Sequence, residues 1–166
     1  MIEEYFDIID ESGNVIGKAT RKECHSNKSL AHRVVHVLVF NSKGELFLQK
    51  RSTNKDIQPC KWDTSVGGHI NPGETFDQAV YRELKEELGI NVPVKHLYNY
   101  WMHSPVETEY VYTYMCIYDG EINFDPYEID DGRFWSIDEI ETNLGTGIFT
   151  PNFEQEFDNW KQKVRV

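Results

Sequence analysis

The sequence predicts an α/β fold in which a mixed β-sheet carries helices on its faces. Segments with the residue types and alternation of strands are interleaved with stretches of helical periodicity. Several strand segments are separated only by short turns, as in antiparallel hairpins. Strands and helices do not alternate strictly, which argues against a doubly wound parallel sheet.

The first part of the chain predicts hairpins and one buried strand. Glycine-containing turns lie between alternating runs, and a β-branched run has the composition of a strand covered on both faces. A polar loop over 52–61 follows these strands. The expected elements are a hairpin over 4–20, a helical turn over 21–26, strands over 33–40 and 45–51, and a short strand over 62–66 ending at Gly67-Gly68.

A central helix is predicted from Thr75 to Leu88. Thr75 and Gln78 have the spacing of a capping box, in which each side chain caps a backbone N–H of the other residue. Gly89 has the residue type that favours the left-handed position just past a helix end. Apolar residues recur every four positions along this segment, so one face should pack on a core.

The last part of the chain predicts three strands and two helices. The strands cover 94–102, 109–118 and a short segment at 134–135. A short helix opens at Ser136, and Thr150-Pro151 has the N-cap and first-turn proline pattern of a helix over 150–163. We expect one domain over 1–166, with the hairpin and this last helix packed on it.

Composition excludes several classes of protein. The chain has 166 residues, 28 Asp+Glu and 17 Lys+Arg, and a net charge of −11, which disfavours broad nucleic-acid binding but allows small phosphorylated substrates. No run approaches the length of a membrane span, so no membrane partner is expected. The acidic N-terminus lacks the layout of a signal peptide, and three separated cysteines form no disulfide framework. These features predict a cytoplasmic protein.

Three glutamates crowd one face of the central helix. Glu83 lies one turn before Glu86 and Glu87, and like charges at this spacing repel by about 0.2–0.5 kcal/mol per pair. They also lie near the helix C-terminus, where the macrodipole favours cations. The arrangement is either a solvated acidic face softened by neighbouring cations or a site where a hard divalent ion removes the repulsion, and Mg²⁺ suits such oxygen ligands.

The segment 68–90 decides between these two interpretations. It fills every fixed position of the pattern G-x5-E-x7-R-E-U-x-E-E-x-G-U, which identifies the sequence as similar to the Nudix hydrolases. Seven of its nine fixed positions demand one residue type, so a chance match is remote. The matching residues are Gly68, Glu74, Arg82, Glu83, Leu84, Glu86, Glu87, Gly89 and Ile90.

The resemblance implies a Nudix-type α/β/α sandwich and a metal-dependent hydrolase that cleaves a diphosphate linked to another group, X. It implies that Glu83, Glu86 and Glu87 ligate Mg²⁺, or Mn²⁺, together with the carbonyl of Gly67. Arg82 would orient the carboxylates. Gly68, Glu74 and Gly89 would keep the structure of the box. Glu86 or Glu87 would act as general base, and Glu109 and Glu128 are the candidates outside the box.

Residues flanking the box are similar to those of the isopentenyl-diphosphate isomerases, a Nudix branch, and of their hydrolase-like relatives. In these isomerases three histidines and two glutamates hold a metal. The matching positions here are His25, His32, His69, Glu107 and Glu109. Such ligands also suit Mn²⁺ or Zn²⁺ on chemical grounds, whereas lone histidines are more often ordinary core or surface residues.

The sequence departs from the isomerases at Gly67. These enzymes have a cysteine there, which transfers a proton at carbon, and glycine has no side chain to replace it. The intact box also differs from the eroded box of the isomerases. Hydrolysis is therefore the expected reaction, and isopentenyl-diphosphate isomerisation is the alternative.

Arg51 and Lys55 match isomerase positions that bind the diphosphate of the substrate. Arg21 or Lys22 is a weaker candidate for a third contact. An arginine fork suits phosphate because it donates two parallel hydrogen bonds. The residues that bind group X are not specified by any motif. Aromatic side chains that could line its pocket, but that more often belong to a core or a surface, are Trp62, Tyr98, Tyr100, Trp101 and Tyr110.

Overall fold

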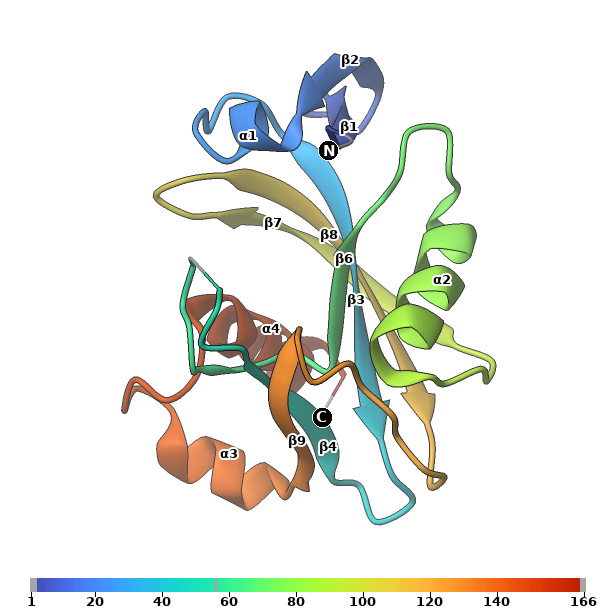
Figure 1. Cartoon of the computed structure of the whole chain (residues 1–166), viewed down its shortest axis with the longest axis vertical. Coiled ribbons are helices and arrows are strands. Elements are labelled where there is room, and N and C mark those ends of the chain that lie inside the picture. The colour runs from blue at the N-terminus through green and yellow to red at the C-terminus, as the bar shows by residue number, and fades with distance from the viewer. Residues whose placement is uncertain (1–2, 56, 165–166) are drawn as a thin grey trace.

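A computed structural model describes residues 3–55 and 57–164 of the chain. Its elements follow the predicted order of hairpins, central helix and C-terminal helix (Figure 1). The strands are β1 (Tyr5–Ile9), β2 (Val15–Thr20), β3 (His32–Phe40), β4 (Leu46–Arg51), β5 (Trp62–Asp63), β6 (Val66–His69), β7 (Lys95–His103), β8 (Thr108–Ile117) and β9 (Ile129–Trp135). The helices are α1 (Arg21–Cys24), α2 (Phe76–Leu88), α3 (Ile137–Asn143) and α4 (Pro151–Lys163).

Strand β3 is the centre of the sheet. It runs parallel to β8 along its whole length, antiparallel to β6 over Val34–Val37, and it meets β1 at one end and β4 at the other. Strand β4 then pairs antiparallel with β5 and β9, and β7 pairs antiparallel with β8. The predicted mixed sheet is confirmed, because one parallel pair is combined with antiparallel hairpins.

The two faces of β3 pack on different helices, which gives the α/β/α layers (Figure 1). Side chains of a strand alternate between its faces. Val35 and Val37 therefore join the core under α2, whereas Leu38 joins the core under α3 and α4. On α2 the buried residues include Leu84 and Leu88, and burial of each such side chain contributes roughly 1.5–3 kcal/mol.

The strand expected over 62–66 is wrong in its extent. The segment forms two strands: β5 pairs with β4, and β6 begins at Val66 and pairs with β3. Between them, Ser65 is completely buried. Its hydroxyl donates to the Phe47 carbonyl and accepts from the Val39 N–H at 3.0 Å. These bonds tie the chain where it changes partner. The strand β6 also continues through Gly67 and Gly68 to His69 instead of ending at the glycines.

Candidate functional site

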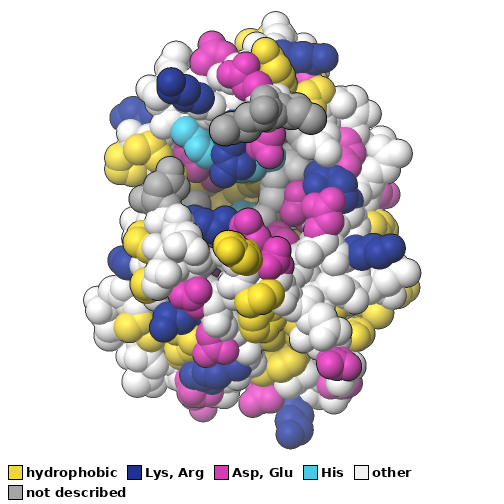
Figure 2. Space-filling view, in the orientation of Figure 1, with side chains coloured by type: hydrophobic (Ala, Val, Ile, Leu, Met, Phe, Trp, Pro, Cys, Tyr) yellow, Lys and Arg dark blue, Asp and Glu magenta, His cyan; other side chains and the backbone are white. Residues whose placement is uncertain are grey.

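A polar cleft of about 560 Å³ runs along β6 and the α2 face that carries the glutamates. Figure 2 shows a hollow on one face of the molecule, with acidic, basic and histidine side chains around it. Its lining comes from the N-terminal hairpin, β3, β4, the loop after β4, β6, α2 and the segments around 107–109 and 125–129. Among the described lining residues, the apolar side chains are Phe6, Val34, Ile57 and Ile129.

Local sequence signals place the glutamates of α2. Thr75 and Gln78 form the predicted reciprocal capping box, and Gly89 ends the helix in the left-handed conformation with φ 68°. The set Glu83, Glu86 and Glu87 is called the glutamate face below. Its members differ in environment: the side chain of Glu83 is 14% exposed, and that of Glu86 is 61% exposed.

Arg82 links the glutamate face to the loop before the helix. Its guanidinium donates to both oxygens of Glu74 at 2.7 and 2.8 Å, to Glu83 Oε1 at 2.6 Å and to the His69 carbonyl at 3.0 Å. The contact with Arg82 holds the pKa of Glu74 below its usual value. Charge-assisted bonds with this fork geometry are strong and directional, so Arg82 is well suited to fix the carboxylates.

Glu87 carries the clearest sign of a missing cation. Gln49 donates to its Oε1 at 2.9 Å, but its Oε2 is buried and has no hydrogen-bond partner among the described residues. Burial and the neighbouring Glu83 raise the pKa of Glu87 well above its usual value, and burial also raises the pKa of Glu83. A buried, unpaired carboxylate is costly. A divalent ion between these carboxylates would remove that cost, so the residues fit an Mg²⁺ or Mn²⁺ ion.

The two glycines of β6 face opposite sides. A Cβ atom on Gly68 would lie 2.2–2.5 Å from the side chain of Glu83, so only glycine lets Glu83 approach the strand. A Cβ atom on Gly67 would point to His36, with its Cδ2 at 3.4 Å and its Nε2 at 3.6 Å. Burial raises the pKa of Glu87, and a hydrogen bond from the backbone of Gly67 opposes that rise, so β6 lies directly beside the glutamate face.

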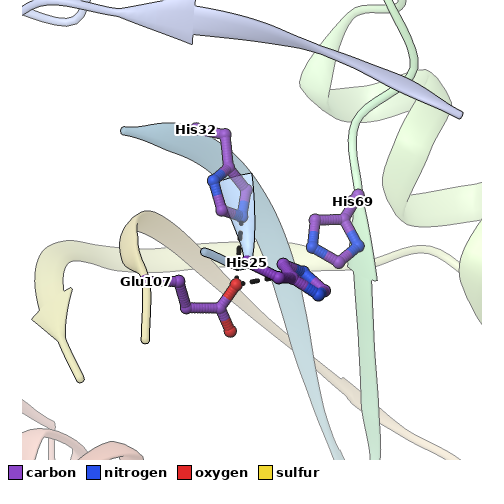
Figure 3. A group of neighbouring side chains, drawn as sticks. All are labelled: His25, His32, His69 and Glu107. Carbon is purple, nitrogen blue, oxygen red and sulfur yellow. Dashed lines mark ion pairs between the residues drawn. The ribbon is translucent and has the colours of Figure 1, made fainter. Parts of the chain in front are cut away.

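A second group of metal-ligand types lies farther along the cleft, and Figure 3 shows its four side chains converging. His25, His32, His69 and Glu107, called the histidine cluster below, each place one ligand atom within 4.8 Å of the others. Glu107 Oε2 lies 3.1 Å from His25 Nε2 and 3.5 Å from His32 Nε2. The structure thus brings together residues from the C-cap of α1, from β3 and β6, and from the loop before β8.

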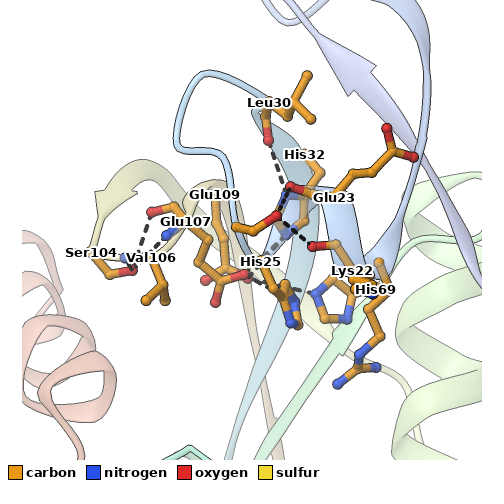
Figure 4. A network of polar contacts seen from close by, with 12 residues as sticks. Lys22, Glu23, His25, Leu30, His32, His69, Ser104, Val106, Glu107 and Glu109 are labelled. Carbon is orange, nitrogen blue, oxygen red and sulfur yellow. Dashed lines mark hydrogen bonds and ion pairs between the residues drawn. The ribbon is translucent and has the colours of Figure 1, made fainter.

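Two contacts aim the ligand atoms of the histidine cluster. The Nδ1 atom of His32 faces the Leu30 carbonyl at 3.5 Å, which leaves Nε2 directed toward the glutamates. Phe6 stacks on His69 with a distance of 4.2 Å between ring centroids. Around Glu107, hydrogen bonds with Ser104 close the turn that carries it (Figure 4). Such outer contacts fix ring orientation in metal sites.

Glu109 completes the predicted set of five. Its Oε2 lies 3.6 Å from His32 Nε2 and 3.8 Å from His69 Nε2 (Figure 4). Burial lowers the pKa of His69 to about 3, so its imidazole is neutral and able to ligate a metal. Burial and the charge of Glu109 raise the pKa of Glu107 to about 7. Of these five side chains, His32 and Glu109 are buried and the other three are half-buried. His32 and His69 each have an Nε2 without a hydrogen-bond partner among the described residues.

The expected diphosphate contacts, Arg51 and Lys55, both line the cleft but already have acidic partners. Arg51 Nη1 lies 3.4 Å from Asp63, and Lys55 Nζ lies 2.5 Å from Glu128. Arg21 lines the cleft as well, in an ion pair with Glu4. Lys22, the other weak candidate, is not among the lining residues.

The aromatic candidates for group X lie outside the cleft lining. Tyr98 and Tyr100 are buried, and their hydroxyls contact Glu156. Trp101 packs on Tyr110 at 4.7 Å between ring centroids, and Trp62 packs edge-on against a core tryptophan. These side chains have the core and surface roles that are ordinary for their types.

Two functional candidates were missed by the sequence reasoning, His36 and Glu156. His36 lines the cleft, and its Nδ1 contacts Glu156 Oε1 at 2.7 Å across 120 positions of sequence. A signal existed for each: His36 interrupts an otherwise apolar strand, and Glu156 falls on the buried face of α4 between Phe153 and Phe157. Neither residue belongs to a motif, so only the structure relates them.

Comparisons with known proteins agree with this geometry. A family model described as the NUDIX domain matches residues 30–157. An uncharacterized Nudix hydrolase of Nostoc sp. is 37% identical over 80% of this chain and 79% of its own length. An isopentenyl-diphosphate Delta-isomerase 2 of Photorhabdus laumondii is 28% identical over 98% of this chain and 100% of its own.

Among solved structures, DR0079 from Deinococcus radiodurans superposes with a TM-score of 0.82 and 25% identity, covering 98% of this chain and 100% of that one. The likeness extends over the N-terminal hairpin and α4 as well as the central sheet, which supports the α/β/α sandwich. No helix among the described residues has the length and apolar character needed to cross a membrane.

Proposed function

The chain belongs to the Nudix hydrolase family, whose members act on phosphoanhydride bonds, and we propose that it hydrolyses the diphosphate bond of a nucleoside diphosphate-linked or other organic diphosphate with a divalent metal ion. The buried, unpartnered Oε2 of Glu87 carries this proposal, because it marks where a cation would complete the glutamate face. Mg²⁺ or Mn²⁺ fits the oxygen ligands there.

The glutamate face and the Gly67 carbonyl would hold the ion. Bound there, a divalent ion neutralises charge on the diphosphate and lowers the pKa of a water that attacks phosphorus. Glu86 or Glu87 would accept the proton of that water. Glu86 is exposed at the cleft wall, and Glu109 and Glu128 lie on other walls of the same cleft, so each stays a candidate base.

The cations of the cleft would bind the phosphates by exchanging partners. Arg51 and Lys55 now neutralise Asp63 and Glu128, and a phosphate oxygen offers each the same charge-assisted bond. Arg82 is different, because its fork is fully used by Glu74, Glu83 and the His69 carbonyl. We therefore assign Arg82 to positioning of the carboxylates.

The histidine cluster with Glu109 would hold a second metal ion. Three imidazoles and carboxylates suit Mn²⁺ or Zn²⁺. The cluster lines the same cleft as the glutamate face through His25, His69 and both of its glutamates. This position favours a role beside the substrate over a remote structural role.

The nature of the lining supports a polar group X. Four apolar side chains among the described lining residues do not form a pocket for a hydrocarbon chain. Isomerisation of isopentenyl diphosphate also needs proton-transfer groups on both sides of the carbon chain. Glu109 could serve on one side, but Gly67 has no side chain. Cys24 and Cys116 are buried in cores, and Cys60 is exposed but is not among the cleft-lining residues.

A substrate panel tests the proposed function. The chain is incubated with nucleotide sugars, dinucleoside polyphosphates, ADP-ribose-type conjugates and prenyl diphosphates, with Mg²⁺, with Mn²⁺ and with a chelator. We expect release of a phosphorylated product from a polar diphosphate and none with the chelator. Equal turnover with and without chelator would refute the metal-dependent hydrolysis.

Isopentenyl diphosphate provides the matched test of the alternative reaction. We expect no dimethylallyl diphosphate in the presence of Mg²⁺, because one proton-transfer group is missing at position 67. Isomer formation at an enzymatic rate would overturn this assignment and would require another side chain, such as Tyr100 or Glu109, to transfer the proton.

A further inference from the structure

The cleft wall contains neutral polar side chains that the hydrolytic mechanism above does not use. Among the described lining residues, the neutral amides and hydroxyls belong to Gln49, Gln58, Thr64, Asn71, Thr150 and Asn152. Gln49 donates to Glu87 and Thr150 donates to Asp63, so both are used within the fold. Asn71 is exposed on the loop before α2. The other three, Gln58, Thr64 and Asn152, are called the neutral polar patch below.

The neutral polar patch has hydrogen-bonding capacity that the fold leaves unused. None of its three side chains has a hydrogen-bond partner within residues 3–55 and 57–164. Thr64 is the most informative, because it is only 3% exposed and its hydroxyl oxygen is buried without a partner. Gln58 and Asn152 are half-buried. Buried polar groups in proteins are normally paired, so an unpaired set in the wall of a cleft indicates a ligand that completes it.

Two contacts of Arg51 place Gln58 and Thr64 at its sides. The Nε atom of Arg51 donates to the carbonyl of Ile57, which precedes Gln58, at 3.0 Å. Its Nη1 lies 3.4 Å from Asp63, which precedes Thr64. Arg51 is an expected diphosphate contact, so both side chains lie next to the position proposed for a phosphate.

The start of α4 brings Asn152 to the same part of the cleft. Thr150, the N-cap of α4, donates to Asp63 Oδ1 at 3.0 Å. Asn152 follows in the first turn of that helix and lines the cleft together with Thr150. The patch thus combines the loop after β4, the segment between β5 and β6, and α4. A group joined to a phosphate at Arg51 would meet all three.

The side-chain types of the patch match the hydroxyl groups of a sugar. Amides and hydroxyls both donate and accept hydrogen bonds, as sugar hydroxyls do. A further phosphate would need cations, which the patch lacks. A stacked nucleobase would need an aromatic side chain. Among the described lining residues, the single side chain from Phe, Tyr and Trp is Phe6, which already stacks on His69 of the histidine cluster.

We propose that Gln58, Thr64 and Asn152 are specificity-determining residues, which bind the hydroxyl groups of a sugar joined to the substrate diphosphate. The inference rests on the proposed function for the presence of a diphosphate, and it narrows group X to a sugar. A site built to hydrogen-bond a hydroxyl group rejects an analogue that lacks it, because the polar groups of the site then stay unpaired.

Three five-carbon diphosphates test this specificity. Ribose 5-diphosphate, 2-deoxyribose 5-diphosphate and n-pentyl diphosphate carry successively fewer hydroxyl groups on the same diphosphate. Water attack on each releases inorganic phosphate and the corresponding monophosphate, and the phosphate is measured with Mg²⁺ present. One neutral hydrogen bond corresponds to about 2- to 10-fold in kcat/KM, so the ribose compound should exceed the pentyl compound by about tenfold or more, with the deoxyribose compound between them.

Two variants assign the preference to the patch. Thr64→Val removes the hydroxyl and keeps the shape, and Asn152→Leu replaces an amide by an apolar group of similar size. In each, the ratio of kcat/KM for ribose 5-diphosphate to that for n-pentyl diphosphate should fall by about 2- to 10-fold. The melting temperature of Thr64→Val should not fall, because its hydroxyl has no partner in the fold to lose. A purely structural role would lower the melting temperature and leave the ratio unchanged.

Asn91→Leu is the matched control. Asn91 is exposed and is not among the cleft-lining residues, so the same change of residue type occurs away from the patch. Surface substitutions of this kind have small effects, and we expect the ratio to stay within about twofold of the wild-type ratio. An equal fall of the ratio in Asn91→Leu and Asn152→Leu would overturn the assignment to the patch.

A binding experiment is independent of turnover. Analogues of ribose 5-diphosphate and n-pentyl diphosphate with a methylene bridge between the phosphorus atoms cannot be hydrolysed there. Their dissociation constants are measured by calorimetry with Mg²⁺. We expect the ribose analogue to bind the wild type about tenfold or more tightly than the pentyl analogue, and this difference should shrink in Thr64→Val and in Asn152→Leu.

Three results would overturn the inference: equal affinities of the two analogues for the wild type, no binding of the ribose analogue at millimolar concentration, or a difference that both variants retain in full. Failure of the proposed function is a separate result. In that case no compound of the panel or of this series is hydrolysed in a metal-dependent way, whereas failure of this inference leaves hydrolysis intact without preference for the sugar.

Discussion

The glutamate face and the histidine cluster lie in one cleft but are built in different ways. The glutamate face comes from five consecutive positions of a single helix, and Arg82 and Glu74 fix it through contacts within the same motif. The histidine cluster gathers side chains from segments as far apart as His25 and Glu107. The first site therefore depends on helix geometry, and the second depends on the correct packing of the whole sheet.

The two sites also differ in how their charges are balanced. An arginine lies against the glutamate face, whereas no lysine or arginine among the described residues forms an ion pair with Glu107 or Glu109. Within the histidine cluster, burial lowers the pKa of His69 to about 3, so that this imidazole is neutral. We therefore expect the histidine cluster to depend more on a bound ion than the glutamate face does.

The largest effect is expected from Glu87→Gln. Loss of the charge at the unpartnered oxygen should leave the fold intact and reduce turnover by on the order of 10²-fold or more at saturating Mg²⁺, because a metal ligand is lost. Glu121→Gln, an exposed position outside the cleft lining, is the control for a charge change alone. Unchanged turnover in Glu87→Gln would remove the glutamate face from the mechanism.

A smaller effect is expected from His25→Ala. Binding of Mn²⁺ is followed by electron paramagnetic resonance. The affinity of one class of Mn²⁺ sites should fall by about tenfold or more, which is the size of loss seen when groups around a metal site are mutated. Turnover should fall less than in Glu87→Gln. His103→Ala, an exposed histidine outside the cluster, is the control. If all bound Mn²⁺ were retained, the histidine cluster would be a set of structural histidines and no metal site.

Gly68→Ala tests how closely the glutamate face must approach the sheet. The new methyl group would overlap Glu83, and relief of such overpacking costs about 1–3 kcal/mol of the free energy of unfolding. Displacement of Glu83 should also lower turnover by roughly tenfold, because small misplacements of reacting groups are costly. Gly17→Ala, where nothing lies within 4 Å, should change neither the melting temperature nor turnover by a comparable amount.

The smallest effect concerns pH and Glu74. Arg82 lowers the pKa of Glu74 below the ordinary value of 4.5, so the folded state binds this proton less tightly than the unfolded state. Its stabilisation is present above pH 4.5 and is lost as the pH falls through the lowered pKa. Glu74→Gln should therefore cost about 1 kcal/mol at pH 7, since the pair is partly solvated.

Melting curves of the two proteins between pH 3 and pH 7 check this expectation. The difference in melting temperature should shrink as the pH falls. A difference that stays constant over this range would show that packing of the side chain, and not its ion pair with Arg82, stabilises the loop.

Local signals predicted most of the elements. Capping residues at Thr75, Ser136 and Thr150 begin the helices at the expected positions, because a cap depends on neighbours three residues away. The prediction of a single strand over 62–66 was wrong, because the segment belongs to two strands, β5 and β6. Ser65 lies between the two strands and is held by hydrogen bonds with Val39 and Phe47. These residues are too distant in sequence for a local pattern to reveal the contact.

By itself, the sequence determined the glutamate face, because residues three and four apart on a helix must share a face, and its spacing identified the family. The resemblance of flanking residues suggested the histidine cluster, but only the tertiary structure placed its ligand atoms within reach of one another. The pairing of His36 with Glu156 was decided by tertiary structure alone. Their contact joins β3 to α4, and such a contact follows from the packing of two layers and not from any periodicity along the chain.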